Sequence, residues 1–248
     1  MNRIAIVLFL LLMISCKKEP VSKGSKLTQP TKNEIAVKSP SEKISSKVDT
    51  IFLSEDEESD KTSYILAHLL DQKADKDSLI TAKYQLDFYT NKTKIAYEKV
   101  VIFPFTPGSS WGASYGIPQK DNMPILSFMH LSFGYEACGY NQQQFLFYLK
   151  DNSLQLVHQW DSMSDGGWGT WIEFGDINPK NELTSFYCKT VSYGYKEGEE
   201  NEEIGTIEHS DSTEFHLKNK RWIKQLLTPK EKVYWKKDVP FNVFYAQQ

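Results

Sequence analysis

Three tryptophans and two aspartates that lie close together in the sequence are the side chains best suited to recognise a ligand. Trp160 and Asp161 are followed by Asp165, and then by Trp168 and Trp171. An indole ring offers an apolar platform and a carboxylate accepts hydrogen bonds from hydroxyls, which is the combination that a sugar ring needs. The spacing therefore predicts a ligand-binding loop here, with rings that cap the end of a β core as the alternative.

A serine motif is the one sequence feature that suggests nucleophilic catalysis. Residues 108–112 read Gly-Ser-Ser-Trp-Gly and spell G-x-S-x-G around Ser110. In α/β hydrolases this serine sits on a turn between a strand and a helix. The following residues include Gly116 and Pro118 and are too short and broken for that helix. We therefore expect a Gly/Ser loop across residues 104–124 and assign no catalytic residue.

Two acidic turns carry oxygen ligands of the kind that bind calcium. Residues 161–167 lack the downstream acid of a calcium loop because Ile172 occupies its position, and residues 175–182 contain Lys180. We interpret both as tight turns. No HExxH pair, phosphate loop or dinucleotide fingerprint occurs, so we predict no metal and no cofactor. The histidines are dispersed, at His68, His130, His158, His209 and His216.

The beginning of the chain has the pattern of a bacterial export signal. Arg3 provides a positive start, and residues 4–14 form an apolar run shorter than the ~20 residues that span a bilayer. Residues 12–16, Leu-Met-Ile-Ser-Cys, resemble the lipobox of bacterial lipoproteins, with Met13 where leucine is usual. The resemblance implies cleavage before Cys16 and attachment of acyl chains such as palmitate to that cysteine, enough for stable anchoring. A secretory signal with a chance cysteine is the alternative.

The residues after Cys16 bear on location. Lys17-Lys18-Glu19 looks like the surface-export signal of lipoproteins from some Gram-negative bacteria, and a solvated linker is its alternative. We expect a lipid-anchored protein of the cell envelope in the outer membrane, facing either the surface or the periplasm. Through this lipid anchor, we expect the membrane to be a partner of the protein.

Composition divides the chain into three parts. Residues 1–15 form the expected signal peptide, residues 16–50 a disordered lipid-anchored linker rich in Lys, Ser, Pro and Thr, and residues 51–248 one mostly-β domain. Residues 17–50 carry eight basic and four acidic side chains, whereas from residue 51 onward the counts are 20 and 28. An acidic domain is repelled by nucleic acid, which we therefore exclude as a partner.

Two cysteines remain if Cys16 is lipidated. Cys138 and Cys188 would then lie in an oxidising compartment, where a disulfide between them is expected and two buried free thiols are the alternative.

Hydrophobic periodicity predicts a mainly β fold. Apolar residues at helical spacing indicate one short N-terminal helix over residues 60–72, with a further helical turn after the capping box at residues 228–231. Alternating patterns then indicate about nine or ten strands, joined mostly by short turns. The expected strands are residues 80–88, 95–103, 125–133, 145–150, 154–160, 170–174, 183–193, 204–209, 213–217 and 221–226, with a terminal strand at 239–245. Such an antiparallel β-meander forms a barrel or a sandwich, and the absence of a fixed repeat disfavours a propeller.

These features favour a non-enzymatic binding or structural module of the envelope, whose loop aromatics contact a glycan, a peptide or another envelope protein. A secreted hydrolase of unknown substrate is the alternative, and an inhibitor or immunity lipoprotein is a third class that the acidic domain permits.

Overall fold

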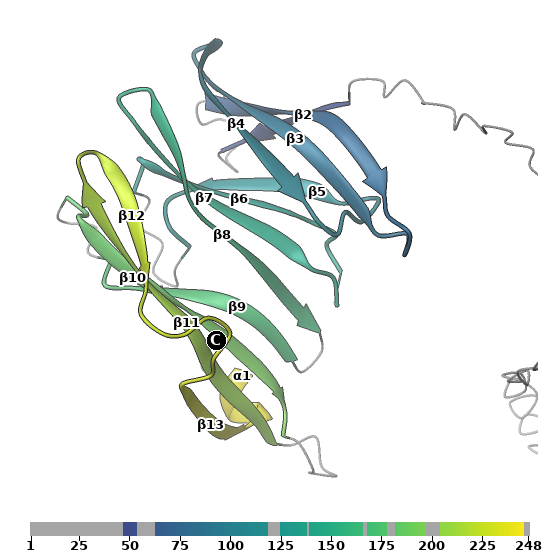
Figure 1. The fold of residues 1–248 in the computed structure, drawn as a ribbon, viewed down its shortest axis with the longest axis vertical. Coiled ribbons are helices and arrows are strands. Elements are labelled where there is room, and N and C mark those ends of the chain that lie inside the picture. The colour runs from purple at the N-terminus through teal and green to yellow at the C-terminus, as the bar shows by residue number, and fades with distance from the viewer. Residues whose placement is uncertain are drawn as a thin grey trace, which may run out of the picture. The chain divides into compact units, whose positions relative to one another are not determined.

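The fold is seen in a computed structural model, which describes residues 47–53, 63–118, 125–137, 139–165, 168–177, 182–196 and 204–245 (Figure 1). All of them belong to one compact unit, residues 43–248. The predicted signal peptide and the predicted lipidation site, Cys16, lie outside the described residues. The predicted mainly β, antiparallel fold is confirmed, because the described part of the chain forms thirteen strands and one short helix. No helix among the described residues is long and apolar enough to cross a membrane.

The first sheet has four antiparallel strands in the order β1-β2-β3-β4. Its strands are β1 (Val48–Phe52), β2 (Ser63–Ala74), β3 (Ile80–Thr90) and β4 (Thr93–Ile102). Because β1 already begins at Val48, the expected linker ends three residues earlier than predicted. The turn between β3 and β4 falls on Asn91 and Lys92, whose φ angles of 50° and 65° suit a two-residue hairpin.

The N-terminal helix predicted for residues 60–72 was wrong. Residues 63–74 form β2, which pairs with β3 along almost its whole length and with β1 over residues 64–68. Ile65 and Ala67 are fully buried while Tyr64 and Leu66 are only partly buried, which is the period of two expected of a strand. The apolar cluster was misread because this strand carries large side chains on both faces.

The second sheet has nine strands, with order β12-β11-β10-β9-β8-β7-β6-β5 and β13 paired with β11. The strands are β5 (Ser110–Tyr115), β6 (Phe128–Gly134), β7 (Gln142–Lys150), β8 (Ser153–Asp165), β9 (Trp168–Gly175), β10 (Ser185–Tyr195), β11 (Ile204–Lys218), β12 (Arg221–Leu226) and β13 (Trp235–Pro240). The long loop predicted for residues 104–124 was therefore wrong at β5, which pairs with β6.

The main core lies between the four-stranded sheet and strands β5–β8 (Figure 1). Phe88 of β3 meets Phe147 of β7 with ring centroids 5.3 Å apart, and Tyr84 meets Trp111 of β5 at 5.4 Å. Both sheets contribute fully buried residues to this cluster. The two sheets therefore pack face to face, as in the sandwich alternative.

A second core forms on the opposite face of β6–β8, against strands β10–β12. Phe128 of β6 lies 5.4 Å from Trp222 of β12 and 5.7 Å from Phe186 of β10, measured between ring centroids. The Gln155 side chain of β8 donates to Trp222 O at 2.7 Å and accepts from Trp222 N at 2.8 Å. Strand β8 pairs with β9 only over three residue pairs, at Met163, Ser164 and Asp165, which lets the sheet fold back on itself.

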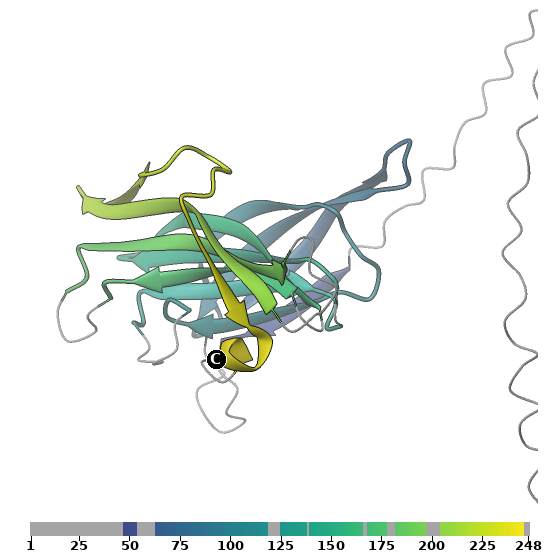
Figure 2. The same cartoon turned by 90° about the horizontal axis from the view of Figure 1, so that it is seen from below.

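The C-terminal segment differs from its prediction. Residues 230 and 231 form a turn rather than a helical turn, and the predicted strand over residues 239–245 is β13 followed by the helix α1 (Phe241–Tyr245). Helix α1 lies beside β13 (Figures 1 and 2). Phe244 stacks on Tyr193 of β10 with centroids 3.9 Å apart, so α1 covers one face of the sheet with a third, small core.

Candidate functional site

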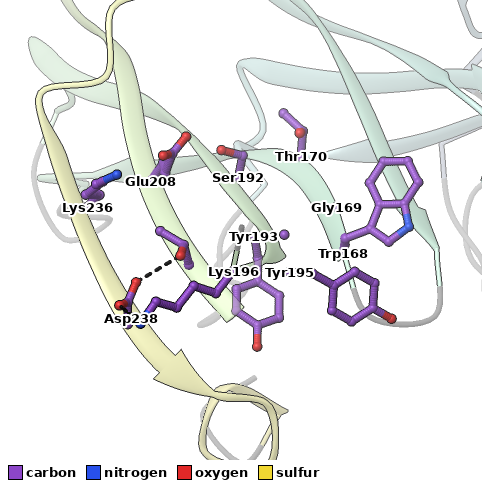
Figure 3. Close-up of a pocket in the computed structure, with 12 residues that line it drawn as sticks. Trp168, Gly169, Thr170, Ser192, Tyr193, Tyr195, Lys196, Glu208, Lys236 and Asp238 are labelled. Carbon is purple, nitrogen blue, oxygen red and sulfur yellow. Dashed lines mark hydrogen bonds and ion pairs between the residues drawn. The ribbon is translucent and has the colours of Figure 1, made fainter. Parts of the chain in front are cut away.

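An open hollow of about 570 Å³ lies on strands β9, β10, β11 and β13 (Figure 3). The polar side chains around it are Thr170, Ser192, Lys196, Thr206, Glu208, Lys236 and Asp238. Trp168 and Tyr195 also line it, with 40% and 48% of their surfaces exposed. The hollow therefore combines exposed aromatic surface with hydrogen-bonding groups of both charges.

The alternation of β10 explains why the hollow is there. Ser192 and Gly194 are small and point to one face, whereas Val191 and Tyr193 are large, buried and belong to the other face, where Tyr193 packs under α1. Small residues leave room on their face, and Ser192 pairs with Glu208 of β11 while Gly194 pairs with Thr206. Across the next pairing, Thr206 faces Asp238 and Glu208 faces Lys236. The polar side chains are thus placed by sheet register rather than by loops.

One wall of the hollow is held by an ion pair. Lys196 Nζ lies 3.1 Å from Asp238 Oδ2, and Thr206 Oγ1 donates to Asp238 Oδ1 at 2.9 Å. Both contacts lower the pKa of Asp238. The carboxylate therefore stays ionised and acts as a hydrogen-bond acceptor, whereas a general acid needs a raised pKa.

Gly194 forms part of the floor and leaves it open. A Cβ atom placed on Gly194 would meet no other atom within 4 Å, so the space above it belongs to the hollow. Gly205 on the neighbouring strand differs, because its Cβ would lie 2.2 Å from the Tyr193 ring. A side chain at residue 194 can therefore enter the hollow without disturbing the protein.

Of the predicted ligand-binding residues, Trp168 alone lines this hollow. Trp160 is instead a core ring. It lies between His130 and His158, with centroid distances of 5.6 and 5.4 Å, and meets Phe174 at 5.5 Å. Trp160 is thus partly buried against the second core, and its part in ligand binding stays a prediction.

The other predicted residues are also separated from the hollow. Trp171 packs against Phe244 at 5.8 Å on the α1 face of the sheet. Asp165 lies against Gly139, whose Cβ would be 3.0 Å from the Asp165 carboxylate. Asp161 lies within β8, where desolvation raises its pKa. The predicted loop is in fact the end of two strands, which face different surroundings.

The serine motif does not form a nucleophile turn. Ser110 is the first residue of β5, pairs with Gly134, and makes no side-chain hydrogen bond to another described residue. A strand occupies the position where α/β hydrolases need a helix. The described residues also contain no group of three or more His, Cys, Asp or Glu side chains that could hold a metal ion.

Cys188 lies in the second core. Its Sγ is 3.8 Å from His158 Nε2, and burial raises the pKa of the thiol to about 12. Burial also lowers the pKa of His158 to about 4, so both groups are neutral and the pair lacks the thiolate that catalysis requires. Cys138 lies outside the described residues, so the disulfide between Cys138 and Cys188 stays a prediction.

Sequence reasoning missed most of the hollow, because its residues come from strands far apart in the chain. Ser192 and Gly194 alternate with large apolar residues, which signals a face without bulk. No local sequence pattern predicts that Thr206 and Glu208 pair with residues of β13. Comparison with protein-family models, with curated proteins and with solved structures finds no match.

Proposed function

We propose that this protein is a membrane-anchored envelope lipoprotein whose β domain binds a glycan without chemical turnover, in the hollow beside Trp168. The observation that carries the proposal is the juxtaposition of an exposed indole with hydroxyl, carboxylate and ammonium groups over an open floor at Gly194. Sugar rings present apolar CH faces and a rim of hydroxyls, which match these two kinds of surface.

The polar groups suit recognition of hydroxyls. Thr170 and Ser192 both donate and accept, Glu208 and ionised Asp238 accept, and Lys236 donates. Strands hold these groups more rigidly than loops would, so little ordering is needed when a ligand binds. A surface peptide of an envelope protein is the alternative ligand, and the same experiment separates the two.

Replacing Trp168 by alanine or Gly194 by valine should each weaken glycan binding at least tenfold, about 1.4 kcal/mol, while thermal unfolding stays within a few degrees. The first change removes the platform and the second fills the floor. Valine suits a strand, and nothing lies near its Cβ. Binding is measured on an array of immobilised oligosaccharides and then by titration with the best oligosaccharide.

Trp235 supplies the matched control. It is also 40% exposed but lies on β13 stacked against His209, outside the hollow. Trp235→Ala should leave glycan affinity unchanged. If it weakens binding as much as Trp168→Ala, or if Gly194→Val binds normally, the ligand does not occupy this hollow. If the native chain binds no glycan but captures a peptide, and Gly194→Val abolishes that capture, the ligand of the hollow is a peptide.

The membrane anchor rests on Cys16 and has its own test. Cys16→Ala should release the protein into the soluble fraction or leave it as an uncleaved precursor, because the acyl chains cannot be attached. Fractionation of cells and the mass of the N-terminal peptide report the outcome. A mature Cys16→Ala protein that still sediments with membranes and resists salt would contradict the anchor.

A further inference from the structure

The outer edge of the second sheet concentrates positive charge. Residues 218–237 contain eight Lys or Arg side chains and one acid, Glu231. The chain from residue 51 onward has 20 basic and 28 acidic side chains, so twelve basic and 27 acidic remain outside this stretch. Among the described residues from 51 onward, 16 acidic and nine basic side chains lie outside this stretch, so the described part of the domain joins one basic edge to an acidic body.

Strands β12 and β13 both pair with the same side of β11, so residues 218–240 run along one edge of the sheet (Figure 2). The connection between them is fixed to the middle of β11. Leu227 N donates to Ser212 O at 2.7 Å, and Ser212 N donates to Thr228 Oγ1 at 3.1 Å. Glu231 N donates to Asp211 Oδ1 at 2.6 Å. The connection is therefore a built part of the surface.

Large apolar side chains accompany this charge. Six of them are between 40% and 52% exposed: Ile223, Leu226, Leu227, Val233, Tyr234 and Trp235. Lysine on an edge strand prevents sheets from pairing with one another, which explains the charge alone. It does not explain exposed Leu, Ile and Trp, which would favour association in water. Apolar and basic side chains together are typical of a surface that lies on a membrane.

Most of the charge is available to a partner. Lys220 Nζ lies 3.2 Å from Asp151 and Lys230 Nζ lies 3.0 Å from Glu231. The other six basic side chains of the edge form no ion pair with a described residue: Lys218, Arg221, Lys224, Lys232, Lys236 and Lys237.

We infer that this edge, residues 218–237, docks on an anionic lipid bilayer. Basic side chains contact the headgroups, and the apolar side chains of the connection enter the interface. Charge complementarity identifies the partner, because each Lys or Arg near an anionic membrane contributes about 1 kcal/mol, or roughly fivefold in affinity. The acidic body is repelled by the same surface, so the contact fixes the orientation of the domain. Lys236 belongs to this edge and also lines the glycan hollow, so the variants below leave it unchanged.

The test uses residues 43–248, a compact unit that contains all three cores and is therefore expected to fold by itself, which circular dichroism checks before flotation. It also lacks Cys16. Its flotation is measured with vesicles of phosphatidylcholine alone and mixed with phosphatidylglycerol. Binding should require phosphatidylglycerol and should fall in ~1 M salt, where the Debye length is about 3 Å. Lys232→Gln with Lys237→Gln should lower partitioning about 25-fold.

Lys76 and Lys83 provide the matched control, because both are exposed but belong to the other sheet: Lys83 lies on β3 and Lys76 in the turn between β2 and β3. Replacing both by glutamine should leave partitioning unchanged, and Leu227→Ser with Val233→Ser should reduce it although no charge is lost. Equal losses in the two lysine pairs, or no binding to phosphatidylglycerol vesicles, would overturn the inference. Unchanged binding of the Leu227→Ser, Val233→Ser variant would also overturn the inference. Binding would then need only the basic side chains, which any anionic polymer could contact as well as a bilayer.

Discussion

Replacing Phe147 by alanine should destabilise the domain by about 4 kcal/mol, the cost usual for removing a buried aromatic ring. Phe147 is fully buried in the middle of β7. It meets Phe88 of the four-stranded sheet at 5.3 Å, so it joins the two layers. Domains are stable by only about 5–15 kcal/mol, so this loss would leave a marginal protein. Urea unfolding followed by tryptophan fluorescence measures it.

Tyr97 of β4 is the control for this prediction, because its ring is 60% exposed. Tyr97→Ala should change the free energy of unfolding by less than about 1 kcal/mol, as is usual for surface positions. Equal effects of the two substitutions would mean that the two sheets do not pack through Phe147.

Acid should weaken the fold through His158. Burial, and to a lesser extent the nearby charge of Lys224, together lower the pKa of its imidazole in the folded chain to about 4. His158 Nδ1 is buried without a hydrogen-bond partner among the described residues, so a charged ring has nothing to stabilise it. In the unfolded chain the pKa is near 6.5. The unfolded state therefore binds the extra proton between these two values.

Because the pKa of His158 is lower in the folded chain than in the unfolded chain, protonation of this ring favours unfolding. The contribution of His158 is fully present above pH ~6.5 and is lost as the pH falls toward 4, a change of about 3 kcal/mol. His158→Gln should be less stable than the native chain at pH 7. The difference in free energy of unfolding between the two proteins should be smaller by this amount at pH 4. Because carboxylates titrate in both proteins, comparing the two isolates the histidine.

His216 is the control, because 38% of its side chain is exposed and its partner is Glu214 on the surface. His216→Gln should show no such narrowing. Urea midpoints across the pH range give both curves. A constant gap between native protein and His158→Gln from pH 7 to pH 4 would show that this ring is not desolvated.

The hairpins could be predicted from the sequence because their turns are marked locally. Residues 151 and 152 separate two alternating runs, and both Asp151 and Asn152 adopt positive φ between β7 and β8, as expected. Strand β2 could not, because apolar residues on both faces match a helical spacing as well as a strand. Its partners β1 and β3 decide the matter by supplying backbone hydrogen bonds on both sides.

The candidate site was predictable only in part. Trp168 is exposed and lies beside polar groups, and its part in ligand binding stays a prediction. Trp160 and Trp171 have similar residues around them in the sequence, but they pack against two different cores. The three rings differ in the face of β8 or β9 on which each lies. The sequence does not predict this face, because the sheet around β8 and β9 is irregular. The charged residues of the hollow depend on β13 returning to pair with β11, a long-range contact without a local signature.

We would first titrate the native chain and Gly194→Val with glycan, because this side chain enters the hollow from its floor and its Cβ has no other atom within 4 Å apart from the neighbouring residues in the chain. We expect at least a tenfold loss of affinity in Gly194→Val, with an unchanged unfolding midpoint. Native affinity in Gly194→Val would contradict the hollow as the binding site.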